Sequence, residues 1–321
     1  MLRFKLARQR GNMNMFAYLY LLPAFVLLGI FTIYPLINTI ITSFRLDYRF
    51  LTGDFVRFSA QHYVDILRDP VFWRACINTA FIAFICVPAS MAAAMGTATL
   101  LHSIKRLKGF FTTLYFLPEV TNIMAAGMVF ALLFNNNFGL INMVLGWFGF
   151  DPVAWISGVG IAGSRELYMQ AYLRCLFVLF VYSVWSGFSL QVILFLGALS
   201  RINPQYYQAS SIDGVGRWKT FWKITFPLLS PTTLYVYITS AIIAFRAFAA
   251  IVALFGPTYG PLGDDSRMMI TIVGYIMDSL GNYLSPGAVS MASAAAVVLL
   301  VIIMVLTALQ MRLSKRWVHY S

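Results

Sequence analysis

Residues 210–231 read SSIDGVGRWKTFWKITFPLLSP, a basic and aromatic segment that lies between two long apolar runs. The segment opens with serines and an Asp-Gly pair, which is typical of a tight turn, and then mixes arginine and lysine with tryptophan and phenylalanine. The neighbouring runs, 173–199 and 232–256, are each long enough to cross a lipid bilayer. The segment therefore predicts a folded connection between two membrane spans.

The composition indicates that lipid surrounds most of the chain. Of its 321 residues, 60% are hydrophobic and 11% are charged, and the mean hydropathy is +0.78. A soluble domain carries about a quarter charged residues, so this chain has too few polar groups to cover a surface in water. Cys76, Cys86 and Cys175 lie in or beside apolar runs, which predicts packing residues and no disulfide framework.

Six apolar runs reach the length of about 20 residues that a transmembrane helix needs. They are 16–44, 78–102, 109–134, 173–199, 232–256 and 289–311. We therefore predict an all-α polytopic membrane protein with six transmembrane helices. Pro23 and Pro35 are expected to kink the first of them.

The positions of lysine and arginine predict the orientation of these spans. One set of connections includes both chain ends and the loop 200–231, and it holds fourteen of the 23 basic residues with a single acid, Asp213. The opposite set holds eight basic and nine acidic residues. The first set is therefore expected to be cytoplasmic, with tails at 1–15 and 313–321 around a transmembrane domain at 16–312. The net charge of +12 is then explained by the basic residues on the cytoplasmic side of the spans, so nucleic acid is not an expected partner.

The loop 200–231 carries the start and stop signals of a short helix. Asn203 is a favoured helix cap, and Pro204 suits the first helical position. Gly214 suits a left-handed stop. Together they predict a helix over 204–214, which we expect to project as a docking element for a soluble partner.

A second helix is expected to begin near Arg217, because apolar residues follow at the spacing of one helical face. The stripe comprises Trp218, Phe221, Trp222, Thr225 and Phe226. Pro227 and Pro231 are expected to end the pattern before the fifth span. An alternative interpretation treats the loop as an interfacial helix with aromatic anchors and no docking role.

The sequence offers no recognisable catalytic or metal-binding pattern. GVGRWKT, residues 214–220, has the look of a phosphate-binding loop, but Trp218 stands where that motif needs a glycine. His62, His102 and His319 lack metal-ligand spacing and are expected at the surface. We therefore predict that the chain is not an enzyme and binds no metal or cofactor itself.

Residues 208–227 resemble the signature of permease subunits from binding-protein-dependent ABC importers. That signature runs Glu-Ala-Ala, two residues, Asp-Gly-Ala, and then Phe, Ile and Leu-Pro at set intervals. The matching positions are Gln208-Ala209-Ser210, Asp213-Gly214-Val215, Phe221, Ile224 and Phe226-Pro227. Gln208 replaces the family's glutamate, Ser210 and Val215 replace alanines, and Phe226 replaces leucine.

The resemblance implies that 204–214 is a coupling helix that docks on a separate ATPase subunit. It implies coupling through 204–226, with five residues at the contact. They are Gln208, Ala209, Ser210, Asp213 and Gly214.

Residues 110–149 resemble the third-span region of carbohydrate-type permeases in the maltose-transporter class. The matching positions are Leu117-Pro118, Leu133-Phe134 and Gly139-Leu140-Ile141-Asn142. The resemblance implies a multi-pass subunit of the bacterial plasma (inner) membrane that imports a carbohydrate or related polyol by alternating access. The implied partners are a second permease subunit, two ATPase subunits that bind ATP and Mg, an extracytoplasmic solute-binding protein, the lipid bilayer and the carbohydrate.

Polar groups inside the spans are the candidates for a translocation pathway, because charges in lipid are costly and tend to face a bundle interior. Glu119 and Arg246 are expected near mid-depth. They either contact substrate or form an ion pair that only fixes the packing of the spans. Further candidates, for stacking and hydrogen bonding to a sugar or for packing alone, are Asn122, Tyr182, Trp185 and Gln191.

An ion-gradient-driven secondary transporter or channel is the main alternative function, since Glu119 has the chemistry of a proton relay. That alternative gives the helix at 204–214 no purpose. A scaffold without transport activity would explain the spans but not the charges inside them. Arg246 is compatible with an anionic cargo such as a phosphorylated polyol or a uronate.

Overall fold

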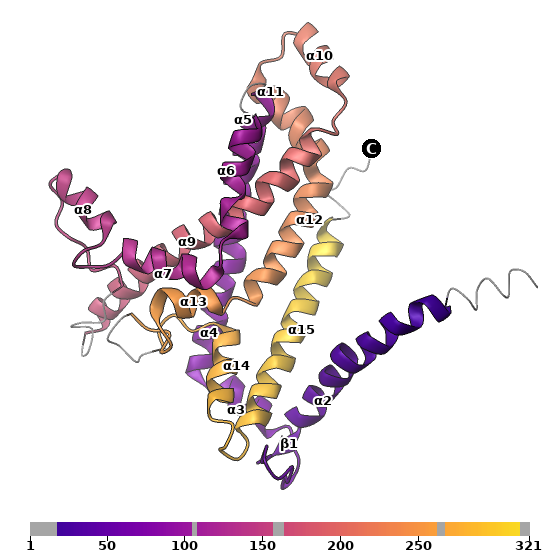
Figure 1. The fold of residues 1–321 in the computed structure, drawn as a ribbon, viewed down its shortest axis with the longest axis vertical. Coiled ribbons are helices and arrows are strands. Elements are labelled where there is room, and N and C mark those ends of the chain that lie inside the picture. Colours follow the sequence, from indigo (N-terminus) through magenta and orange to yellow (C-terminus); the bar gives the residue numbers. More distant parts are fainter. Residues whose placement is uncertain (1–17, 105–107, 157–163, 262–266, 315–321) are drawn as a thin grey trace, which may run out of the picture. The chain divides into compact units, whose positions relative to one another are not determined.

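The computed structural model describes residues 18–104, 108–156, 164–261 and 267–314 (Figure 1). Within these ranges the regular structure is helical apart from one pair of two-residue strands. The tail predicted at 1–15 lies outside the described residues, as do Lys105, Arg106 and most of the tail predicted at 313–321.

The chain forms two compact units. The first takes in residues up to 66 together with 278–298, and the second takes in 67–277 together with the residues from 299 onward.

The first unit holds the first apolar helix and a small hairpin. Its elements are the helix Tyr18–Ser43, which contains η1 (Gly29–Ile33) and α2 (Tyr34–Ser43), then β1 (Arg45–Leu46), β2 (Arg57–Phe58) and most of α3 (Gln61–Arg68). The strands pair antiparallel, with Arg45 opposite Phe58. A hydrogen bond of 2.7 Å between the hydroxyls of Ser43 and Tyr63 ties the end of α2 to α3.

His62 corrects one sequence-based expectation. The side chain is buried, with 7% of its surface exposed, although the sequence predicted a surface position. The reason is a tertiary contact, because α3 turns the ring toward Gly287, where a Cβ would lie 3.3 Å from Cε1. His102 is exposed as predicted, and His319 lies outside the described residues.

The second unit is organised around the long helix α9, against which α5, α6 and α12 pack (Figure 1). The helices after α3 follow in chain order. They are α4 (Pro70–Phe81), η2 (Ile82–Cys86), α5 (Val87–Ser103), α6 (Lys108–Val120), α7 (Ile123–Leu133), α8 (Leu140–Trp147), α9 (Arg165–Leu199), α10 (Pro204–Ile212), α11 (Arg217–Thr220), η3 (Phe221–Thr225), α12 (Phe226–Phe245), α13 (Ala249–Phe255), α14 (Ile272–Gly281) and α15 (Ala288–Ser314).

The described residues contain five helices that are long and apolar enough to cross a membrane, and one bent pair that makes a sixth candidate. The five are Tyr18–Ser43, Pro70–Ser103, Arg165–Leu199, Arg217–Phe245 and Ala288–Ser314, and the pair is Gly109–Val120 with Ile123–Leu133. The two halves of the pair meet at 97°. The fold is therefore that of a nearly all-helical polytopic membrane protein, as the apolar runs predicted.

Prolines explain the three π-helical turns. Each turn ends two residues before a proline, namely Pro35 after η1, Pro88 after η2 and Pro227 after η3. Proline has no backbone N–H, and its ring crowds the carbonyl four residues earlier. A π-helical turn, closed by bonds over five residues such as Phe226 N–H to Phe221 O, makes room for the ring.

The prediction that Pro227 and Pro231 end the helix before the fifth span is therefore wrong. The helix runs without interruption from Arg217 to Phe245, because η3 accommodates the first proline and the second lies inside α12.

The far end of the fifth span also differs from the prediction of 232–256. α12 ends at Phe245, and the backbone is outside the helical region at Arg246 (φ −98°, ψ 8°) and at Phe248 (φ −144°, ψ −62°) before α13 begins. The separate helix α13 packs against α7 (Figure 1). The packing is close, because a Cβ on Gly127 of α7 would lie 2.4 Å from the Cβ of Ala253 in α13.

Candidate functional site

Helix α10 begins at Pro204 as predicted and ends at Ile212, two residues before the predicted end at 214, with the predicted cap residues at both ends. The Asn203 side chain accepts a hydrogen bond of 3.0 Å from the Gln205 N–H, and Pro204 follows as the first helical residue. At the other end Gly214 is left-handed, with φ 67°. Val215 N–H donates to Ser210 O and Gly214 N–H to Ser211 O, the two bonds of a Schellman motif. Both ends of this helix of nine residues are therefore satisfied locally, and its shape does not depend on a partner.

Four of the five predicted coupling residues are exposed on or beside α10. They are Gln208, Ala209, Asp213 and Gly214. Ser210, the fifth, is buried with 5% of its surface exposed. Ile212, next to this group, is 86% exposed, so α10 offers a partner an apolar side chain together with polar ones.

Two side-chain hydrogen bonds tie α10 to the helix that follows it. The hydroxyls of Ser210 and Thr220 lie 2.7 Å apart, and those of Tyr207 and Thr225 lie 3.2 Å apart. Thr220 is the last residue of α11, and Thr225 is the last residue of η3. Sequence reasoning missed Tyr207 and Thr220, since hydroxyl pairs across a turn leave no periodic signal.

The aromatic stripe predicted after Arg217 forms one cluster. Trp218, Phe221, Trp222 and Phe226 contact one another with ring centroids 5.2–6.4 Å apart. Trp218 is 75% exposed and Trp222 is 47% exposed. Such a surface suits the boundary between lipid and water, as the interfacial interpretation expects for this part of the loop.

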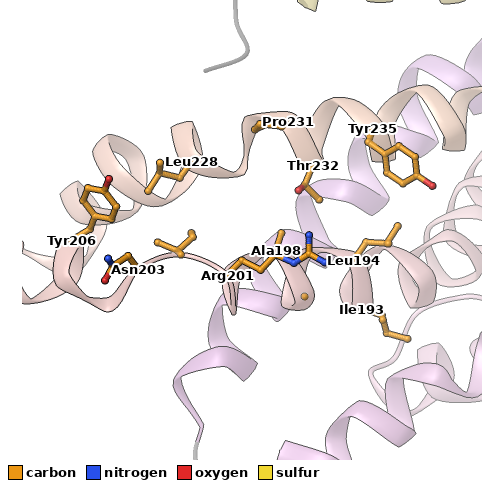
Figure 2. Close-up of a pocket in the computed structure, with 12 residues that line it drawn as sticks. Ile193, Leu194, Ala198, Arg201, Asn203, Tyr206, Leu228, Pro231, Thr232 and Tyr235 are labelled. Carbon is orange, nitrogen blue, oxygen red and sulfur yellow. The ribbon is translucent and has the colours of Figure 1, made fainter. Parts of the chain in front are cut away.

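A cleft of about 670 Å³ opens between the end of α9 and the first part of α12, beside α10 (Figure 2). Figure 2 shows Leu194 and Arg201 on the α9 side and Leu228, Thr232 and Tyr235 on the α12 side. The other lining residues are Ile193, Gly197, Ala198, Ile202, Asn203, Tyr206 and Pro231. Further along, the Gln191 amide donates to the Ser240 hydroxyl at 3.1 Å, so α9 and α12 are joined beyond the cleft.

Two of the predicted pathway residues lie at the break between α6 and α7. Asn122 caps α7, because its side-chain oxygen accepts bonds from Met124 N–H at 2.9 Å and Ala125 N–H at 3.2 Å. Glu119 lies three residues earlier, near the end of α6, and is exposed. The cap starts a new helix directly after the old one ends, and the two helices meet there at 97°.

Two aromatic candidates lie beside the same break. The Tyr182 hydroxyl donates to Ile123 O at 3.3 Å, and its ring lies 5.3 Å from Phe130. Trp185 lies 5.1 Å from Phe130 and is only partly buried. The structure therefore places Asn122 and the Tyr182 hydroxyl at the start of α7 and the Trp185 ring against Phe130, further along the same helix.

Arg246 caps the end of α12 and is exposed. Within the part of the chain that the structure describes, no ion pair joins Arg246 to Glu119. The structure thus places Glu119 near the break between α6 and α7 and Arg246 at the end of α12, without an ion pair between them.

Comparison with known proteins identifies the family. Residues 87–319 match the family described as "Binding-protein-dependent transport system inner membrane component". The lactose transport system permease protein LacF of Rhizobium radiobacter is 28% identical over 298 residues, which cover 91% of this chain and 92% of LacF. The sulfoquinovosyl glycerol transport system permease protein SmoG of Agrobacterium fabrum is 28% identical over 302 residues, which cover 94% of this chain and 90% of SmoG.

The fold also has a solved counterpart. The crystal structure of a bacterial ABC transporter involved in the import of the acidic polysaccharide alginate contains a chain with a TM-score of 0.73 and 19% identity, over 97% of this chain and 98% of that one.

These matches confirm the resemblance read from residues 208–227 and 110–149, and they confirm a transport subunit of the inner membrane in place of an enzyme. The chain belongs to the family of inner-membrane components of binding-protein-dependent transport systems.

Proposed function

We propose that this chain is one of two membrane subunits of an ATP-driven importer that moves a carbohydrate or related polyol into a bacterial cell. The observation that carries the proposal is α10, a helix capped at both ends that offers Gln208, Ala209 and Ile212 to a partner. A helix that needs no partner for its own shape, in a chain of this family, is suited to dock as a rigid body.

The proposed orientation places α10 and both termini in the cytoplasm. The basic residues of the loop and of the chain ends support it through the positive-inside rule. Two ATPase subunits would then bind ATP and Mg, and one of them would hold α10 through Gln208, Ala209, Asp213 and Gly214. Closure of the ATPase pair would move the membrane subunits between inward-facing and outward-facing states.

The proposed pathway runs past the break between α6 and α7 and past the end of α12. Breaks in transmembrane helices are tolerated where the backbone is buried in protein or lines an aqueous cavity, and such breaks often form binding sites near the midplane. Arg246 lies six residues beyond Ser240, or about 9 Å along α12. Tyr182 lies nine residues from Gln191, or about 14 Å along α9 in the same direction. Because Gln191 contacts Ser240, both points fall at the level of Tyr182 and Trp185.

The proposed cargo is a carbohydrate, with Trp185 as a stacking surface and Tyr182 and the Asn122 amide nitrogen as hydrogen-bonding groups. The names of LacF and SmoG refer to carbohydrate cargoes, and the solved counterpart imports an acidic polysaccharide. The exposed guanidinium of Arg246 favours a cargo that carries an anionic group.

The test is assembly and ATP-dependent uptake. The chain would be co-expressed with the partner permease, ATPase and binding protein, and Ala209→Cys would carry a photo-crosslinker. Cross-linking to the ATPase, with uptake that stops when the ATPase is omitted, supports the proposal. Uptake that continues without the ATPase and stops when the ion gradient is dissipated would favour the gradient-driven alternative instead.

A further inference from the structure

We propose that Tyr207 and Ser210 are positioning residues that fix α10 to η3, so that the part of the α11–α12 helix before Ser240 moves as a lever against α9. This inference rests on the proposed docking of α10 to an ATPase and names the residues that carry its motion into the membrane. The lever moves within the cleft beside α10.

The two hydroxyl pairs enclose the π-helical turn. Ser210 bonds to Thr220, immediately before η3, and Tyr207 bonds to Thr225, its last residue. Ser210 and Thr225 are 5% and 4% exposed, so water competes weakly for these bonds. One bond alone would leave α10 able to rotate about it. Two bonds, one immediately before η3 and one at its last residue, fix both the position and the direction of α10.

The turn η3 is the part of this helix that most needs such support. Its π-helical form is imposed by Pro227, which removes a backbone hydrogen bond at the start of α12. A push on an unsupported π turn would bend the turn, and the force would be lost there. The bonds on either side let α10 carry force past it to α12.

The lever has a fixed point and free space. Its fixed point is the hydrogen bond from Gln191 to Ser240, which holds α12 on α9 at 3.1 Å. Fifteen residues separate Ser240 from Thr225, or about 22 Å of helix. Between that bond and α10 the two helices line the cleft of about 670 Å³, which gives the lever room to move (Figure 2).

The test changes only the threonine of each hydroxyl pair, so α10 itself is unaltered. The double variant Thr220→Val with Thr225→Val removes both bonds at nearly constant side-chain volume, and it also removes the bond from the Thr220 hydroxyl to Gly216 O. Thr220→Ser with Thr225→Ser keeps both hydroxyls. Thr239→Val is the matched control, because that hydroxyl bonds only within α12, to Tyr235 O and Val236 O.

The measurement uses two pairs of spin labels in the complete transporter, reconstituted in vesicles of phosphatidylethanolamine and phosphatidylglycerol. The chain would first have its three native cysteines replaced. Labels at Gln205 and Lys223 report the position of α10 on η3. Labels at Gly197 and Tyr235 report the distance across the cleft. Each distance is recorded without nucleotide and with ATP and Mg trapped by vanadate.

In the parent chain we expect trapping to change the distance across the cleft and to leave the Gln205–Lys223 distance unchanged. In the double valine variant the Gln205–Lys223 distribution should broaden, and the change across the cleft should fall to less than half. The serine variant and Thr239→Val should behave like the parent chain. Should the double valine variant fail to fold, Thr225→Val and Tyr207→Phe are tested singly for the same broadening.

A change across the cleft that is as large in the valine variant as in the parent chain overturns the inference and leaves the proposed function standing. So does a parent chain that holds the ATPase but shows no change across the cleft. A chain that never associates with an ATPase overturns the proposed function, and the inference falls with it.

Discussion

Gly127 and Ala253 bring α7 and α13 so close that a Cβ on Gly127 would lie 2.4 Å from the Cβ of Ala253. Gly127→Ala should therefore push the helices apart and lower the stability of the folded chain by about 1–3 kcal/mol. The thermal midpoint of the purified chain in detergent measures this. Ala253→Gly in the same chain removes the opposing methyl group and should recover most of the loss. Gly146→Ala, with open space around the site, is the control, and an equal drop there would contradict the close contact.

Asn78 should be essential to the packing of the segment before α14. Its amide nitrogen donates to Met268 O at 3.0 Å and Ile270 O at 2.8 Å, and its oxygen accepts from the Tyr172 hydroxyl at 2.7 Å. Asn78→Ala leaves these buried groups without partners, at a cost of about 1–3 kcal/mol for each unsatisfied group. Hydrogen exchange of residues 268–272, followed by mass spectrometry, should rise strongly.

The control for Asn78 is Tyr172→Phe, which removes one bond and leaves both carbonyls satisfied. Its effect on exchange in 268–272 should be much smaller. Equal exchange in the two variants would show that the carbonyl bonds do not hold the segment.

Gly214 should matter for coupling through its backbone conformation. An L residue at φ 67° costs about 1–2 kcal/mol, and asparagine tolerates this region better than alanine does. Gly214→Ala should therefore weaken the stimulation of ATP hydrolysis by the binding protein several-fold, and Gly214→Asn should weaken it less. Gly216→Ala, at φ −65°, should have a smaller effect than Gly214→Ala. The reverse order for the two alanine variants would exclude the conformational cause.

Arg246 and Glu119 should act separately. No ion pair links them within the described residues, so exchanging the two charges should not restore what a single reversal removes. If the proposed anionic carbohydrate is the cargo, Arg246→Gln should reduce uptake of an anionic carbohydrate more than tenfold and uptake of a neutral one by a smaller factor. Both uptakes are measured in proteoliposomes with the matching binding protein. Full recovery in the exchanged double variant would instead establish a structural ion pair.

Local signals made α10 predictable from the sequence. The cap at Asn203, the first-turn proline at Pro204 and the left-handed Gly214 act over a few residues each, and the structure shows all three. The apolar runs predicted the spans for the same reason, since length and composition are local properties.

Tertiary packing decided the features that sequence reasoning missed. His62 is buried by a contact with Gly287, far along the chain. The end of α12 at Phe245 goes with the docking of α13 on α7, a contact across more than a hundred residues. The bonds of Tyr207 and Ser210 to threonines depend on how two helices fold back on each other.

The π turns before Pro35, Pro88 and Pro227 change how the faces of these helices must be numbered. Each turn holds about one residue more than an α-helical turn, which rotates everything after it by about 100°. A helical wheel drawn straight through Arg217–Phe245 would therefore assign most residues either before or after η3 to the wrong face of the helix. A cysteine-accessibility scan of this span should restart its periodicity at Phe226, and lipid-facing and water-facing positions would then separate cleanly.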